Sequence, residues 1–152
     1  MNQRYVSDAI VTDGQPEPTF EKDAELHHQP TTWPGARLPH AWVFDRDTGA
    51  QVSTLDLCGG GAFTLLTGIG GEAWCEAAAS LETELGIKIQ THVIGPRQPH
   101  VDHVGDWARA SEITDTGCVL VRPDHHVAWR TQDMAGDPGA ELRRVLTHVL
   151  AR

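Results

Sequence analysis

The chain has 152 residues, of which 39% are hydrophobic, and its 21 acidic against 12 basic residues give a formal net charge of −9. This length and apolar share suffice for one domain with a hydrophobic core and argue against a chain that is disordered throughout. The acidic balance disfavours a nucleic acid as partner, because affinity for phosphates comes from Lys and Arg.

Cysteine usage and the lack of long apolar runs point to a cytoplasmic protein. Cys58, Cys75 and Cys118 are widely spaced and form neither a disulfide framework nor a zinc-binding pattern. The stretch from Met1 to Glu25 is polar and carries no secretory signal. The apolar runs are too short to span a bilayer. We therefore expect a soluble, cytoplasmic protein without membrane association.

The beginning of the chain predicts an extended lead-in. It is rich in Pro, Asp, Glu, Thr and Gly and lacks the sustained periodicity of a helix or strand. We expect residues 1–39 to be a linker that lies on another surface, the remnant of a junction with a missing upstream domain. Residues 40–152 then form the compact domain. Within the linker, Trp33 is a candidate anchor against a partner surface.

Regular structure is predicted from residue 40 onward. His40–Phe44 and Gln51–Thr54 are typical of two strands joined in a hairpin, with Asp and Gly at the turn. Phe63–Thr67 predicts a buried strand between glycine-rich flanks. Apolar residues at helical spacing predict a helix over Glu72–Leu85 that a glycine ends. The alternation within Ile87–Ile94 predicts a half-exposed strand.

The second half predicts an irregular crossover, a hairpin and a helix. Gly95–Thr116 is polar, with one helical turn expected around Trp107. Cys118–Arg122 and Val127–Arg130 predict the two strands of the hairpin. Asp137-Pro138 supplies an N-cap and a proline at the first position of the last helix.

The order of these elements predicts the fold. From residue 63 it is strand, helix, strand, crossover, strand, strand, helix, and a strand–helix–strand unit takes a right-handed crossover. We expect an α/β, thioredoxin-like fold, in which helices flank a central mixed sheet, with an extra N-terminal hairpin and an extended N-terminal lead-in. Trp42, Trp74 and Trp129 fall on regular elements and are expected in the core.

A glycine-rich turn follows the first buried strand and opens the helix. Gly68–Ala73 fits G-x-G-x-x-A, the pattern that lets a pyrophosphate approach a helix N-terminus. The following strand offers Lys88, Gln90 and His92 where a ribose-binding Asp or Glu is needed. We therefore favour a packing turn over a dinucleotide site.

A redox-active thioredoxin fold carries C-x-x-C at this turn, with a thiolate stabilised by the helix N-terminus. Here Cys75 stands without a local partner, and Thr116-Gly117 replaces the proline expected before the second hairpin. We favour Cys75 as a small helix residue and Cys118 as a core-facing strand residue. A stand-alone thiol oxidoreductase using Cys75 or Cys118 remains the alternative function.

Nine histidines raise the possibility of a metal site. The densest clusters are His100-Val101-Asp102-His103 and Asp124-His125-His126, yet neither supplies a third and fourth ligand at a recognisable spacing. We favour exposed loop histidines, His27-His28 included. No nucleophile elbow G-x-S-x-G is present for a hydrolase. We accordingly expect no catalytic, cofactor-binding or metal-binding residue in the chain.

Several segments resemble the C-terminal domain of flavin-dependent phenol hydroxylases, above all those of the 2,4-dichlorophenol hydroxylase group. Gln29–Trp42 resembles the stretch that opens that domain, and Ser53–Thr67 resembles its S-T-x-D-L…G-x-F-T-L-L-T-G segment. Val119–Asp124 followed by Val127–Arg130 is similar to its terminal hairpin, and Asn2–Tyr5 is similar to the end of the preceding domain. The resemblance covers essentially the whole chain.

The resemblance implies a parent enzyme that uses FAD and NAD(P)H to insert one oxygen atom into a phenolic ring. It also implies that the flavin and substrate sites lie upstream, so no catalytic residue carries over to this chain and no cofactor is expected in it. The chain is then a non-catalytic, thioredoxin-like domain with a structural role. Its expected partners are the missing FAD domain and a second copy in a homodimer.

Overall fold

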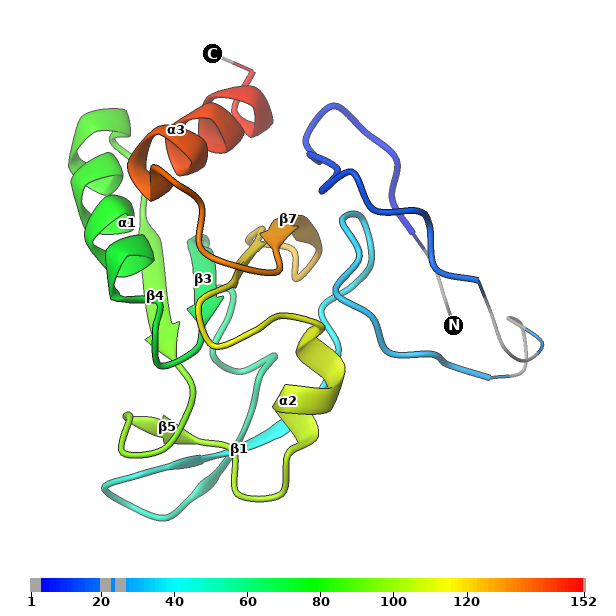
Figure 1. Cartoon of the computed structure of the whole chain (residues 1–152), viewed down its shortest axis with the longest axis vertical. Coiled ribbons are helices and arrows are strands. Elements are labelled where there is room, and N and C mark those ends of the chain that lie inside the picture. The colour runs from blue at the N-terminus through cyan, green and yellow to red at the C-terminus, as the bar shows by residue number, and fades with distance from the viewer. Residues whose placement is uncertain (1–3, 20–22, 24–26, 152) are drawn as a thin grey trace.

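The computed structural model describes residues 4–19, 23 and 27–151, and within them the chain forms two sheets and three helices in a mixed α/β arrangement (Figure 1). The larger sheet has the order β4-β3-β6-β7. Its strands are β3 (Phe63–Thr67), β4 (Ile89–Val93), β6 (Cys118–Val121) and β7 (Val127–Thr131). β3 pairs parallel with β4 and antiparallel with β6, and β6 pairs antiparallel with β7.

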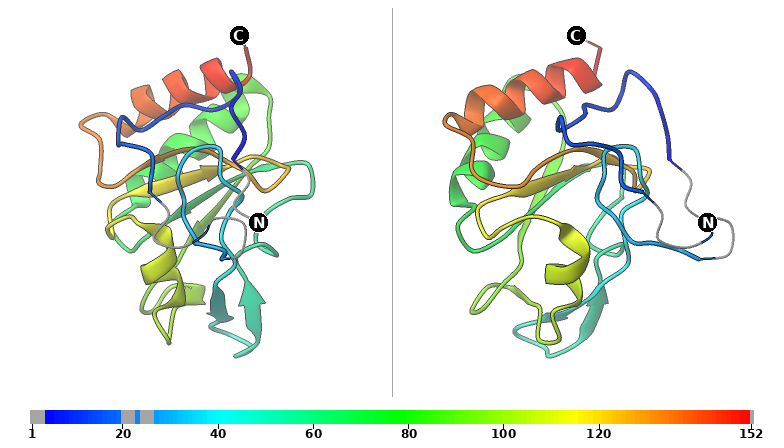
Figure 2. Two further views of the ribbon diagram at one scale, coloured as in Figure 1. Left: turned by 90° about the vertical axis from the view of Figure 1, so that its right-hand side faces the viewer. Right: turned by 45° about the vertical axis from the view of Figure 1, so that its right-hand side comes forward.

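Helices α1 (Glu72–Leu85) and α3 (Pro138–Val149) pack together on one face of this sheet, and α2 (Asp106–Ser111) lies beyond the other (Figure 2). α1 ends because Gly86 adopts the left-handed conformation, with a φ of 64°. α3 begins because Asp137 accepts a hydrogen bond from the N–H of Ala140 at 2.9 Å, and Pro138 occupies the first position.

The smaller sheet has the order β2-β1-β5 and lies below the larger one in Figure 1. It consists of β1 (Trp42–Asp45), β2 (Gln51–Ser53) and β5 (His100–Val101), all antiparallel. The turn between β1 and β2 is fixed by Asp45, whose Oδ1 accepts hydrogen bonds from the N–H and the hydroxyl of Thr48 at 2.8 Å.

Side chains point alternately to the two faces of the larger sheet, so the interior is divided into two hydrophobic cores, one on each face. In β3, Leu65 packs toward α1 and α3 while Leu66 packs toward the smaller sheet and α2. In β6, Leu120 packs toward α1 and α3, and Val119 packs toward the smaller sheet and α2. All four side chains are fully buried, so β3 and β6 are the centre of the molecule.

Residues 4–19 and 27–39, here called the strap, lie along the outer edge of β7 (Figure 2, right). The N–H of Gly35 donates to the carbonyl of Val127 at 2.8 Å, and the N–H of Val127 donates to the carbonyl of Ala36 at 2.9 Å. The N–H of Val11 donates to the carbonyl of Ala128 at 2.8 Å, and the N–H of Leu38 donates to His125 at 2.8 Å. The strap therefore continues the ladder of the sheet by irregular backbone pairing.

Most predicted elements are confirmed, and three features differ. The helix over Glu72–Leu85 has the predicted bounds. The observed bounds of the predicted strands agree with the predicted ones within two residues at each end. The segment 95–116 is not merely irregular, because it contains β5, which pairs with β1 and turns the extra hairpin into a second sheet. The single turn expected around Trp107 is the six-residue helix α2.

The third difference concerns the tryptophans. Trp74 and Trp129 are buried in the core as predicted, with ring centroids 5.7 Å apart. Trp42 is 39% exposed, so its assignment to the core was wrong. On β1 its neighbour Val43 takes the buried face, and the ring of Trp42 instead packs edge-on against His40. No helix within the described ranges is long and apolar enough to cross a bilayer.

Replacing Gly71 tests the close packing at the start of α1. A Cβ at this position would lie 1.8 Å from Oγ1 of Thr67, which is itself held by a 2.6 Å hydrogen bond to the carbonyl of Gly117. We expect G71A to lower the free energy of unfolding by about 1–3 kcal/mol or more, as overpacking does. Urea denaturation measures the change.

The matched control is G136A. Gly136 has no heavy atom within 4 Å of a Cβ, so the substitution should change the free energy of unfolding by less than about 0.5 kcal/mol. Equal destabilisation by the two variants would contradict the packing role assigned to Gly71.

Candidate functional site

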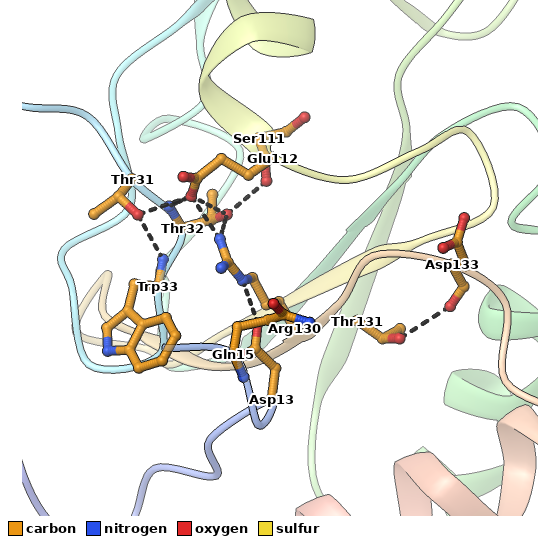
Figure 3. Close-up of polar contacts among 10 residues, drawn as sticks. All are labelled: Asp13, Gln15, Thr31, Thr32, Trp33, Ser111, Glu112, Arg130, Thr131 and Asp133. Carbon is orange, nitrogen blue, oxygen red and sulfur yellow. Dashed lines mark hydrogen bonds and ion pairs between the residues drawn. The ribbon is translucent and has the colours of Figure 1, made fainter. Parts of the chain in front are cut away.

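The most strongly built polar cluster surrounds Arg130 in β7 (Figure 3). Arg130 is only 4% exposed. Its Nε donates to Asp13 Oδ2 at 2.7 Å, and its Nη1 donates to Glu112 Oε2 at 2.5 Å and to Thr32 Oγ1 at 3.0 Å. The guanidinium carbon lies 5.7 Å from the ring centroid of Trp33. One buried cation thus joins three chain segments.

Glu112 is held in place by the strap as well as by Arg130. It follows α2 in the left-handed conformation, with a φ of 56°, which is uncommon for a residue other than glycine. Its Oε2 accepts hydrogen bonds from the hydroxyl of Thr31 at 2.7 Å and from the N–H of Thr32 at 2.8 Å. Thr32 in turn donates to the carbonyl of Ser111 at 2.5 Å.

These contacts keep Glu112 ionised. Partial burial raises the pKa of its carboxyl, but the hydrogen bonds from Thr31 and Thr32 and the charge of Arg130 outweigh burial, so that the net pKa is lowered. An arginine keeps its proton under all ordinary conditions. The pair is therefore charged on both sides at neutral pH.

Asp13 reaches Arg130 from the other limb of the strap. Its side chain is 6% exposed, and its second oxygen, Oδ1, accepts a hydrogen bond from the N–H of Gln15 at 3.0 Å. Between them Gly14 takes a φ of 77°, which makes the tight turn at the strap tip. The carboxylates of Asp13 and Glu112 are both occupied by Arg130 and by hydrogen bonds from the strap, so we describe this cluster as a clamp.

A polar cleft of about 460 Å³ lies beside the clamp, between the strap tip, the end of β7 and α3. Glu141 and Arg144 on its α3 side pair through two hydrogen bonds of 2.7 and 3.1 Å. None of the buried polar atoms that lack a partner in the described part of the chain belongs to a residue lining this cleft. The cleft therefore contains no buried, unpartnered side-chain atom that would point to a specific ligand.

The glycine-rich turn predicted at Gly68–Ala73 is filled by another loop. A Cβ at Gly68 would lie 2.6 Å from the Asp115 backbone, and one at Gly70 would lie 2.7 Å from Thr116. The N–H of Gly70 donates to the carbonyl of Asp115 at 2.9 Å. Both glycines serve close packing, and the space through which a pyrophosphate would approach α1 is occupied by protein.

The cysteines lack the environment of a reactive thiol. Burial raises the pKa of Cys75 and raises that of Cys118 well above its usual range, and it raises the pKa of Cys58 to about 11. A thiol nucleophile needs the opposite shift, toward the thiolate. The position of Cys75 in the first turn of α1 does not compensate for its burial. No observation supports the thiol oxidoreductase alternative.

The first histidine cluster is divided among separate contacts. His100 is half-buried on β5 rather than exposed in a loop, and its ring lies 5.1 Å from that of His92. His103 packs against Phe44 at 5.1 Å, and Asp102 accepts a backbone hydrogen bond in the first turn of α2.

The histidines of the second cluster also make separate contacts. His126 Nδ1 lies 3.5 Å from Asp124 Oδ1, and His125 Nε2 lies 3.2 Å from the carbonyl oxygen of Leu55. His27 and His28 are exposed. Within the ranges that the structure describes, no three potential metal ligands come together.

Sequence reasoning missed the clamp. Arg130 is the one charged residue of β7 and follows three apolar residues, and a charge at such a position signals a buried pair. The identity of its partners carries no local signal, because Asp13 and Thr32 are 117 and 98 residues away. Trp33, predicted as an anchor against a partner, packs against Arg130 of its own chain.

Comparison with known proteins gives a consistent result. The family described as "Aromatic-ring hydroxylase, C-terminal" matches residues 31–152. The chain is 51% identical over 152 residues to the 2,4-dichlorophenol 6-monooxygenase of Cupriavidus pinatubonensis, a match that covers 100% of this chain and 25% of the relative. It is 46% identical over 147 residues to the phenol 2-monooxygenase of a Pseudomonas species, covering 97% of this chain and 24% of the relative.

A solved structure agrees with these matches. The flavin-dependent monooxygenase PieE, in complex with FAD and substrate, superposes with a TM-score of 0.90 at 46% identity. The superposition covers 99% of this chain and 25% of that protein. The chain thus spans about a quarter of the length of the relatives that it matches.

Removing the guanidinium tests the clamp. We expect R130M to lower the free energy of unfolding by about 3–5 kcal/mol, because a buried carboxylate is left without its counter-ion. R143M is the control, since Arg143 pairs with Glu84 on the surface and should change stability by no more than about 1 kcal/mol. Urea denaturation at neutral pH compares the two. The triple variant R130M/D13N/E112Q should regain part of the loss, and equal effects of R130M and R143M would refute the clamp.

The lowered pKa of Glu112 gives a prediction in acid. A carboxyl whose pKa is lower in the folded than in the unfolded state stabilises the fold above its ordinary pKa of 4.5 and loses this contribution as the pH falls through the lowered value. We expect E112Q to be less stable than the wild type at pH 7, and the difference to shrink as the pH is lowered below 4.5. Urea midpoints across this range measure it, and a difference that does not depend on pH would exclude the ionised pair.

Proposed function

The chain belongs to the family of aromatic-ring hydroxylase C-terminal domains, and from this premise we propose that it is the non-catalytic, structural C-terminal domain of an FAD-dependent monooxygenase that hydroxylates a phenol or chlorophenol. The observation that carries the proposal is the Arg130 clamp, a buried ion-pair cluster that fixes the strap to the domain. The rest of the parent protein would lie on the N-terminal side.

We assign the domain a thioredoxin-like fold with an added hairpin. In support, a parallel strand–helix–strand unit, β3-α1-β4, is followed by the antiparallel pair β6-β7 and by α3, which packs beside α1. In this assignment residues 1–39 are the junction with the upstream domain and residues 40–152 are the thioredoxin-like unit. Asn2 and Gln3, whose resemblance to the preceding domain is part of this reading, lie outside the described residues.

The residues present do not fit a flavin or nicotinamide site. The one turn with a dinucleotide-like pattern is filled by Asp115 and Thr116, and the strand that follows α1 offers no carboxylate for a ribose. The raised pKa values of Cys75 and Cys118 argue against thiol chemistry in place of flavin chemistry. FAD and NAD(P)H would therefore belong to the upstream part of the parent, which supplies the oxygen-transfer chemistry.

The role left to the domain is mechanical. Because Arg130 binds both limbs of the strap, a force or displacement at the junction is transmitted directly to β7 in the sheet. We infer that the upstream FAD domain is the primary partner, that a homodimer is the second, and that the protein works in the cytoplasm. The net charge of −9 argues against nucleic acid as a partner.

A chimaera tests the proposal. The chain replaces the matching segment of the Cupriavidus 2,4-dichlorophenol 6-monooxygenase, which is 51% identical to it. We expect the chimaera to retain FAD and to hydroxylate 2,4-dichlorophenol with NADPH, and the isolated chain to bind no FAD in equilibrium dialysis. Stoichiometric binding of FAD by the isolated chain would overturn the non-catalytic role. A folded chimaera without flavin or activity would overturn the assignment as an interchangeable domain.

A further inference from the structure

A cavity of about 170 Å³ lies where the two parallel strands of the larger sheet end, next to α2 (Figure 1). The segments that follow β3 and β4 line one side of it, and α2 and residues 113–115 line the other. The loops after neighbouring parallel strands diverge at this edge of a sheet, and ligands commonly bind between them. The cavity is therefore at a position where α/β proteins often place a binding site.

The cavity has a buried, largely apolar floor and an exposed rim. Ile94 and Trp107 are each 4% exposed, and Gly68 and Gly95 bring bare backbone to the wall. Ile113 is half-buried. The lining residues that are exposed to solvent are Pro96, Ala108, Thr114 and Asp115. A small apolar body can therefore enter from solvent and lie against buried side chains.

One polar group at the cavity lacks a partner. Asp102 lines it, and Asp102 Oδ2 accepts a hydrogen bond from the N–H of Ala108 at 2.8 Å. The other oxygen, Oδ1, is buried and has no hydrogen-bond partner in the part of the chain that the structure describes. Such an oxygen is unfavourable until a donor satisfies it. The cavity thus differs from the cleft beside the clamp, because it calls for a ligand with a hydrogen-bond donor.

These features select the chemistry of the ligand. An apolar cavity of about 150 Å³ in another protein accepts benzene, so a single aromatic ring fits a space of this size. Trp107 and the two isoleucines favour a ring, because aromatic and apolar side chains predominate in sites for small molecules. The carboxylate of Asp102 accepts from a donor and repels an anion. The ligand is then an uncharged ring compound that carries one donor group.

We propose that the cavity binds one molecule of a neutral phenol, whose hydroxyl donates to Asp102 Oδ1 and whose ring lies against Trp107 and Ile94. The choice of a phenol rests on the proposed function, because a phenol or chlorophenol is the compound that the parent protein would hydroxylate. Trp107 belongs to α2, which ends at Ser111, whose carbonyl accepts from Thr32 at 2.5 Å. A bound ring therefore stabilises the helix that leads into the clamp.

Titration of the chain with phenol, followed by NMR chemical shifts, tests the proposal. We expect the indole N–H signal of Trp107 and the amide signals of Gly95 and Ile113 to move and to saturate, with a dissociation constant on the order of 1 mM, which so small a ligand can reach. Anisole has the same ring but no donor, and it should bind about tenfold more weakly. Shifts that do not saturate, or that are spread over surfaces remote from the cavity, overturn the proposal. Equal affinities for phenol and anisole overturn it as well.

The variant D102N separates the roles of the two oxygens of Asp102. Its amide oxygen can still accept from the N–H of Ala108, while its amide nitrogen, a donor, takes the place of the unpartnered Oδ1. We expect phenol to bind about tenfold more weakly to D102N, and the preference for phenol over anisole to disappear.

The matched control is D106N. Asp106 pairs with Arg109 on the surface of α2 and lies outside the residues that line the cavity, so the affinity for phenol should stay within about twofold of the wild type. Equal affinities of D102N and D106N contradict the proposal. If D102N does not fold, the comparison of phenol with anisole in the wild-type chain decides.

These measurements use the chain alone and do not depend on the chimaera described above. If the chimaera is active but the chain does not bind phenol, this inference fails while the proposed function stands. If the chain binds phenol at the cavity but the chimaera folds without flavin or activity, the proposed function fails and the binding site stands.

Discussion

A guanidinium that is almost fully buried constrains the rest of this structure. Arg130 is buried on β7 opposite Val119 of β6, and removing its charge from water costs several kcal/mol unless carboxylates and hydroxyls surround it. Those groups come from Asp13, Thr32 and Glu112, none of which is on the same strand. The strap must therefore cross β7 at this point, and α2 must end where Glu112 can reach it.

The clamp also explains an unusual backbone conformation. Glu112 is in the left-handed region, which costs of order 1 kcal/mol for a residue with a side chain. Hydrogen bonds from the Thr31 hydroxyl and the Thr32 N–H and an ion pair with Arg130 all involve a single carboxylate oxygen, and together they offset that cost. The same interactions order the second limb of the strap. The domain and the segment leading into it are thus one cooperative unit at this site.

Features that depend on residues close together in the sequence could be predicted, whereas features that depend on distant residues could not. The bounds of α1 and the cap at Asp137 were predictable because they depend on residues within one or two helical turns. β5 was not, because two residues carry no periodicity and their pairing with Phe44 joins segments more than fifty residues apart. The exposure of Trp42 was missed because side chains alternate between the two faces of a strand. This alternation does not tell which of the two faces is covered by another element. Family membership was accessible, since a long segment such as Gln29–Trp42 is specific by itself.

The hydrogen bonds between the strap and β7 affect how the domain behaves in solution. β7 is the last strand of the larger sheet, and an edge strand with free N–H and carbonyl groups can pair with a strand of another molecule. Gly35, Ala36 and Val11 occupy those groups along Val127 and Ala128. A version of the domain cut at His40, where regular structure begins, would present an open and apolar edge. The strap therefore protects the domain against edge-to-edge aggregation.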